Sequence, residues 1–98
     1  MEKAIVSSNG AVSLGTVSAA SDANTKKELQ YLILSADADC SIQLFNDSTA
    51  ITNKFFLSAA LTQTINLKGL GLEATNLKYT STGTANFSIL VGFITKGN

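Results

Sequence analysis

The chain is a succession of short segments in which apolar and polar residues alternate, with turn residues between them. The clearest is TANFSILVGFIT, residues 84–95, where every second residue from Phe87 to Phe93 is large and apolar. Alternation with a period of two is the pattern of a strand with one buried face. This segment therefore predicts a strand that buries Phe87, Ile89, Val91 and Phe93.

Similar segments follow one another along the whole chain, at the spacing of about 8 to 12 residues that is typical of β-sandwiches and barrels. Turn-rich stretches such as SSNG, DADC, KGLGL and STGT separate them, and no window shows a helical period. Only SDANTKK, residues 21–27, has room for a helical turn, with Ser21 or Asp22 as its cap. We expect one all-β domain over residues 1–98, an antiparallel β-sandwich of about eight strands with jelly-roll or Greek-key connections.

The alternation also predicts which residues are buried and which remain on the surface. The expected core contains Ile33, Ile42, Leu44, Ile65, Phe87, Ile89 and Val91. Leu90 and Ile94 fall on the opposite face of the last segment, and the adjacent Phe55 and Phe56 must point to opposite sides of one strand. These four residues are the candidate interface of a homo-oligomer, for which a trimer is one arrangement, unless a loop or the N-terminal KAIV segment covers Leu90 and Ile94.

Composition narrows the classes of partner. Only 14% of the residues are charged, against about 25% in an average domain, and the net charge is zero. Every basic residue is Lys and Trp is absent, so binding dominated by nucleic-acid phosphates is not expected. We interpret the run Lys26, Lys27 and Glu28 as a solvated turn or strand edge. No apolar run approaches the roughly 18 residues of a membrane span, so we expect no membrane partner. We expect the protein to be made in a cytoplasm.

Residues with catalytic or ligating chemistry are few. The chain has no His, and its one cysteine, Cys40, alternates with Ile42 and Leu44 as a small buried residue would. Asp37 and Asp39, even with Asp47, supply too few oxygens for a calcium site and are expected to bond within a hairpin turn. Gly69 and Gly71 lack the spacing of a phosphate loop. The sequence predicts no catalytic, cofactor or metal site.

A carbohydrate-binding function stays an alternative, because the chain has Tyr31, Tyr79 and loops rich in Ser, Thr and Asn. Such sites generally present exposed aromatic platforms. Tyr31 lies among alternating core positions, so we interpret it as a tyrosine at the edge of the core with its hydroxyl at the surface.

One region resembles a known family. Over roughly residues 39 to 94, an Asp-Ser-Thr loop is followed by LTQTINL, by GLGL and LKYT, and by TGTANFSILVGF. This order resembles the small β-sandwich structural proteins of tailed-phage virions, especially head decoration (cement) proteins. The resemblance implies a jelly-roll-like fold, self-association, location in the virion and attachment to the major capsid protein, with no catalytic residues. The alternatives are a carbohydrate- or receptor-binding module of a phage tail or fibre, and a cellular β-sandwich adaptor or unrelated structural subunit.

Overall fold

The computed structural model describes residues 2–22, 24–59 and 61–97, and the regular structure in these ranges is all β-strand. The strands are β1 (Glu2–Asn9), β2 (Val12–Ser21), β3 (Lys26–Ala36), β4 (Cys40–Asn46), β5 (Thr49–Ala50), β6 (Phe55–Leu57), β7 (Thr62–Asn66), β8 (Glu73–Ala74), β9 (Asn76–Thr82) and β10 (Asn86–Gly97). The expected all-β class is confirmed. Two strands beyond the predicted eight or so are accounted for by β5 and β8, which have two residues each.

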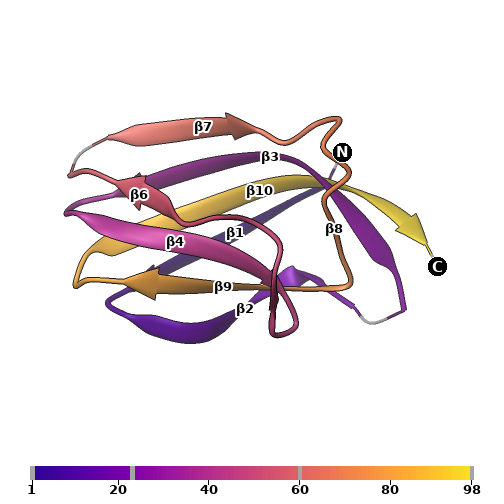
Figure 1. The fold of residues 1–98 in the computed structure, drawn as a ribbon, viewed down its shortest axis with the longest axis horizontal. Coiled ribbons are helices and arrows are strands. Elements are labelled where there is room, and N and C mark those ends of the chain that lie inside the picture. The colour runs from indigo at the N-terminus through magenta and orange to yellow at the C-terminus, as the bar shows by residue number, and fades with distance from the viewer. Residues whose placement is uncertain (1, 23, 60, 98) are drawn as a thin grey trace.

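The strands form two antiparallel sheets packed face to face (Figure 1). The first, here called the β1 sheet, has the order β1-β10-β3-β7, with β8 also beside β3. The second, the β2 sheet, has the order β2-β9-β4-β5, with β6 also beside β4. The longer strands alternate between the two layers along the chain, so that β1, β3, β7 and β10 face β2, β4 and β9. This alternation is the double Greek key of a jelly roll, one of the two connection patterns that we expected.

The core lies between the inward faces of the two sheets. Five of the seven predicted core residues are buried there: Ile42, Leu44, Phe87, Ile89 and Val91. Phe93 is buried as well, so the whole inward face of the last strand is as the alternation predicted. The aromatic rings of Tyr79 and Phe87 meet edge to face, with 5.9 Å between their centroids, which joins the two layers.

Ile33 is the error in the predicted core, because it is only half-buried. Ile65 is also half-buried, but it packs against the core from the margin. In β3, Leu32 and Leu34 take the inward positions, so Ile33 points to the outside of the β1 sheet. Ile65 lies on β7, the edge strand of that sheet, where no further strand shields it.

Two tyrosines lie directly over glycines of neighbouring strands. A Cβ atom on Gly92 would come within 2.1 Å of the Tyr31 ring, and one on Gly15 within 2.4 Å of the Tyr79 ring. Each glycine therefore makes room for an aromatic ring on a pleated surface that a side chain would otherwise occupy. Gly15 also follows a register shift in the β2–β9 pairing, which marks a bulge or irregularity in β2.

The segment 21–27 is not a helical turn in its described residues, and Ala23 lies outside them. Ser21 ends β2, and Asp22 organises the turn instead. Its carboxylate accepts a hydrogen bond from the Asn24 backbone N–H at 2.9 Å, and its carbonyl accepts one from the Thr25 N–H at 3.1 Å.

Lys27 corrects our interpretation of the Lys26–Glu28 run, because it is only 3% exposed. Its ammonium donates to three backbone carbonyls, those of Asp22 at 2.8 Å, Thr25 at 3.0 Å and Thr75 at 2.7 Å. Three acceptors satisfy the three N–H bonds of an ammonium group, which makes its burial tolerable. Lys27 thereby ties the β2–β3 turn to the segment between β8 and β9.

Candidate functional site

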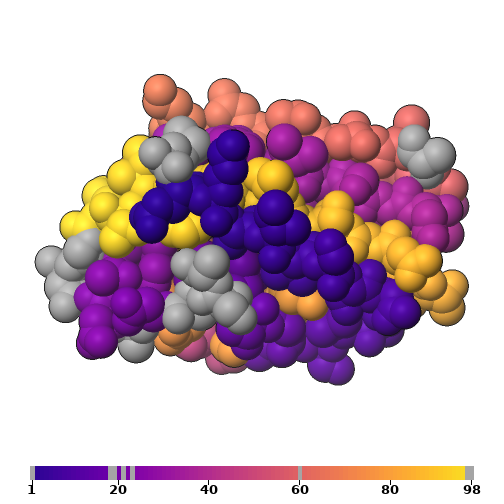
Figure 2. Space-filling model, turned by 180° about the vertical axis from the view of Figure 1, so that it is seen from behind, coloured from indigo at the N-terminus to yellow at the C-terminus, as the bar shows by residue number. Residues whose placement is uncertain are grey.

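The most extensive candidate surface is the side of the β1 sheet that points away from the core, here called the outer face (Figure 2). Its side chains form rows across the four strands, because directly paired residues share a face. The rows, read from β1 through β10 and β3 to β7, are Ser7, Ser88, Ser35 and Thr62; then Ile5, Leu90, Ile33 and Thr64; then Lys3, Gly92, Tyr31 and Asn66.

The middle row is apolar across three strands. Ile5 is 67% exposed, while Leu90 and Ile33 are half-buried between their neighbours. Ile94, further along β10, is 43% exposed. The N-terminal KAIV segment does not cover this row, because β1 lies beside β10 in the same sheet and adds Ile5 to it. The apolar surface predicted from Leu90 and Ile94 is therefore continuous with residues from two further strands.

A row of hydroxyl groups borders the apolar row on one side. Ser35 and Ser88 share a hydrogen bond between their hydroxyl oxygens at 2.7 Å. The other side is formed by the Tyr31 ring over Gly92. In these three rows the one charged residue is Lys3 on β1; beyond them, Ile94 lies opposite Glu28, which pairs with Glu73, and Glu73 forms an ion pair with Lys96 at 3.0 Å. The outer face thus presents apolar and hydroxyl surface with little charge.

Phe55 and Phe56 lie in the other sheet, so the four candidate interface residues do not form one surface. Both belong to β6 and point to opposite sides, as expected of adjacent residues. Phe55 is half-buried and packs against the core beside its partner Ile42, whereas Phe56 is 72% exposed opposite Ser41. Phe56 is an isolated apolar residue on the outside of the β2 sheet, and Leu90 and Ile94 belong to the outer face.

A groove of about 570 Å³ runs between the two sheets at their β7 and β5–β6 edges. Its floor is apolar, with contributions from Phe55, Ile65 and Leu72. Gln43, Asn53 and Asn66 are also among the lining residues. The Gln43 amide already donates to the Thr52 carbonyl at 2.8 Å.

The aspartates of DADC lie in a connection between the two sheets, from β3 to β4, and not in the hairpin turn that we expected. The Asp37 carboxylate accepts two hydrogen bonds from Asn86, from the side-chain amide at 2.6 Å and the backbone N–H at 2.8 Å. These bonds hold the Asp37 pKa below its ordinary value. Asp39 instead accepts a bond from the Ala59 N–H at 3.3 Å. Each carboxylate therefore has a structural partner of its own.

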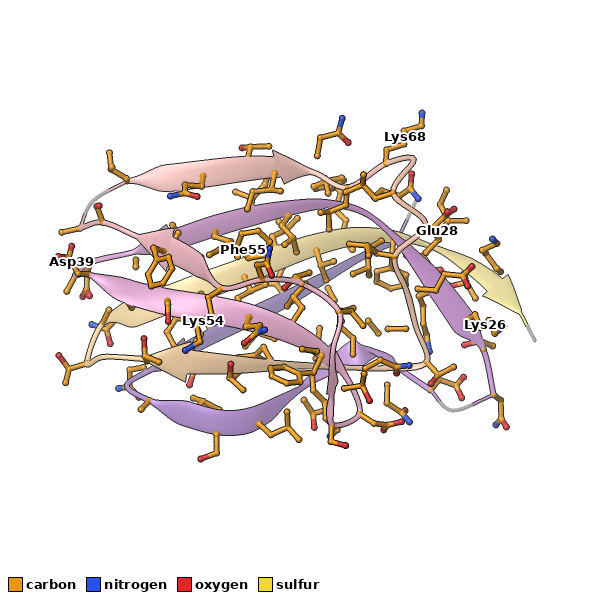
Figure 3. All side chains as sticks on the ribbon, in the orientation of Figure 1. Lys26, Glu28, Asp39, Lys54, Phe55 and Lys68 are labelled. Atoms are coloured by element: carbon orange, nitrogen blue, oxygen red, sulfur yellow. The ribbon has the colours of Figure 1, made fainter. Side chains whose placement is uncertain are left out.

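Charged side chains lie at both ends of the sandwich (Figure 3). Figure 3 shows Asp39 at one end of the sandwich and Lys26, Glu28 and Lys68 toward the other. Within residues 2–22, 24–59 and 61–97, no three His, Cys, Asp or Glu side chains are grouped as metal ligands would be. Cys40 is buried, as its alternation predicted, and burial raises the pKa of its thiol, with the charges of Asp37 and Asp39 adding to the shift. A raised pKa disfavours the thiolate that nucleophilic chemistry requires.

Sequence reasoning missed Ile5, Ile33 and Tyr31 as members of the outer face. Ile33 was assigned to the core because LQYLILSA is apolar on both faces and its alternation has no clear phase. Ile5 and Tyr31 join Leu90 only through the strand order β1-β10-β3, which no local pattern reveals.

Comparison with known proteins adds no relative: neither a family model, nor a curated protein, nor a solved structure matches this chain. Among the described residues there is no helix of the length and hydropathy needed to cross a membrane.

Proposed function

We propose that this protein is a non-enzymatic structural component of a phage virion, a capsid decoration (cement) protein that self-associates and binds the major capsid protein on the outside of the head. The proposal starts from the resemblance of residues 39 to 94 to that family. A jelly roll is compatible with it, because viral capsid domains are among the proteins that use this fold. Fold alone does not decide function, so the argument depends on the surface.

The observation that carries the proposal is the outer face. Ile5, Leu90 and Ile33 form an apolar row across three strands, bordered by hydroxyl groups. Contiguous apolar surface with a polar rim is typical of protein–protein interfaces. A sheet face of this kind suits contact with a broad surface such as a capsid shell.

The weak charge of the outer face predicts how binding responds to salt. An interface held by surface charges loosens as ionic strength rises, whereas apolar contact does not. We therefore expect the protein to bind shells about equally well at low and high salt.

The test has two parts. A protein inventory of purified particles should contain this chain at a copy number comparable with that of the major capsid protein. Purified protein added to stripped particles should then restore decoration at both ionic strengths, and a Leu90→Asp, Ile94→Asp variant should fail to do so. Leu14→Asp is the matched control. The exposed fraction of Leu14, 41%, is similar to the 43% of Ile94, but Leu14 lies on β2 in the other sheet. Equal binding by all three proteins, or absence of the chain from particles, would refute the proposal.

The groove supports a second candidate, a carbohydrate- or receptor-binding module of a phage tail or fibre. Its apolar floor with Phe55 and its amides are the kinds of group that line ligand sites, and lectin domains also use jelly rolls. Such a protein would occur in only a few copies per particle and would bind glycans. Asn53→Ala should then weaken glycan binding while the Leu90→Asp, Ile94→Asp variant retains it.

A further inference from the structure

We infer that two copies of this protein associate through β1, by antiparallel pairing of the free edges of that strand across a two-fold axis. This inference rests on the proposed function, because the proposed self-association is the reason for choosing a second copy as the partner. It concerns the edge of the β1 sheet, which is distinct from the outer face that we propose for capsid binding.

The backbone of β1 has hydrogen-bonding groups that its one strand neighbour does not use. The Gly10 N–H donates to the Ala85 carbonyl at 3.0 Å, at the position that continues the β1–β10 register. In an antiparallel pair, directly opposed residues alternate along the strands. One pair exchanges two N–H···O hydrogen bonds, and the backbone N–H and C=O groups of the next pair point away from the partner strand. From Gly10, the alternation directs the backbone groups of even-numbered residues toward β10. It directs those of Lys3, Ile5 and Ser7 away, to the free edge.

The other sheet edges have features that discourage pairing, and β1 has fewer of them. Short strands and bulges are common protections of exposed edges. In the described residues, β5 and β8 have two residues each, β6 has three and β7 has five. The remaining edge, β2, carries two register shifts against β9. In contrast, β1 pairs with β10 in unbroken register over eight residues.

The sequence of β1 fits pairing with itself. A two-fold axis at Ile5 places Ile5 opposite its own copy and Lys3 opposite Ser7, so these three residues with edge-directed groups meet one another. Each such pair can exchange both N–H···O bonds. No like charges face one another, because Lys3 lies opposite a serine. An edge-to-edge contact between identical patches is the isologous arrangement of a closed dimer.

This pairing also extends the outer face. Ile33, Leu90 and Ile5 of one copy would continue into Ile5, Leu90 and Ile33 of the other, so the apolar row would double in length. The most exposed residue of that row, Ile5 at 67%, would gain a neighbour. The expected oligomer is therefore a dimer, and not the trimer considered from the sequence.

Two variants test the edge without disturbing the monomer. Ser7→Pro removes an N–H that β10 does not use, and proline is tolerated on that side of an edge strand; Ser7→Ala retains the N–H and is its control. Ile5→Lys places two ammonium groups beside each other across the axis. In sedimentation velocity, the wild type and Ser7→Ala should run at twice the monomer mass. Ser7→Pro and Ile5→Lys should dissociate at least ten-fold more readily, with unchanged circular dichroism.

Amide hydrogen exchange supplies a readout that does not depend on substitution. The N–H groups of Lys3, Ile5 and Ser7 should be protected only at concentrations where the dimer forms, while those of Ala4 and Val6 are protected in the monomer too. A wild type that stays monomeric with unprotected Ile5, or a dimer that Ser7→Pro and Ile5→Lys leave intact, would overturn the inference. Either result would leave capsid binding by the outer face to be judged by the Leu90→Asp, Ile94→Asp variant.

Discussion

Phe87 is a buried core residue, 4% exposed, whose ring meets the ring of Tyr79 from the opposite sheet. We expect Phe87→Ala to lower the free energy of unfolding by about 3–5 kcal/mol, the usual cost of removing a buried phenyl ring. Phe56→Ala is the control, since Phe56 is 72% exposed and its removal should change stability by less than about 0.5 kcal/mol. Urea unfolding measures both. Equal effects would contradict the inward register of β10.

Asp37 makes stability depend on pH. Its pKa is lowered by the hydrogen bonds from the Asn86 side chain and backbone, so the folded state holds the carboxylate more strongly than the unfolded chain does. The stabilisation is therefore complete above the ordinary value of 3.8 and is lost as pH falls through the folded value.

Asp37→Asn should consequently lose less stability than the wild type between about pH 5 and pH 2. Glu73, whose pKa is lowered by Lys96, has the same sign, so adding Glu73→Gln should flatten the profile further. Urea unfolding across this range is the measurement, and identical slopes for the three proteins would contradict the role of Asp37.

At the scale of elements, Lys27 joins segments that are distant in sequence. Lys27→Met leaves three carbonyls without their donor, and we expect unfolding to become easier by about 1–3 kcal/mol. The adjacent Lys26 is exposed, so Lys26→Met is a matched control that should change stability by less than about 0.5 kcal/mol. Comparable losses in both variants would show that the three hydrogen bonds contribute little.

Individual strands differ in how far their residues predict them. The last strand has one apolar and one mixed face, so its alternation identified the buried set from Phe87 to Phe93. In β3, both faces are apolar, and a register shift against β10 leaves the consecutive residues Leu29 and Gln30 both buried. The alternation of inward and outward residues changes phase at that irregularity, so a strict period of two assigned Ile33 to the wrong face. Lys27 was misplaced because its acceptors come from tertiary structure.

At the scale of the whole molecule, turn spacing and alternation were sufficient for the all-β sandwich, because both are local properties. The outer face was only half predictable: Leu90 and Ile94 follow from one strand, but Ile5 and Ile33 join Leu90 through strand order. The same holds for the edge of β1. Its free backbone groups exist because β1 lies at the end of a sheet, and that position is a property of the fold and not of the segment EKAIVSSN.

The pairing of β1 with β10 also has a consequence for how the chain folds. These strands are the first and last of the described chain, so β1 has no ladder partner until nearly every other residue has been synthesised. Contacts between distant residues must overcome loop-closure entropy before they stabilise anything, and folds dominated by such contacts typically fold in milliseconds to seconds. During that delay the apolar residues of the early strands remain in water. Formation of the β1–β10 ladder only after all the intervening strands have been made, at a rate set by topology, is thus built into the order of the strands.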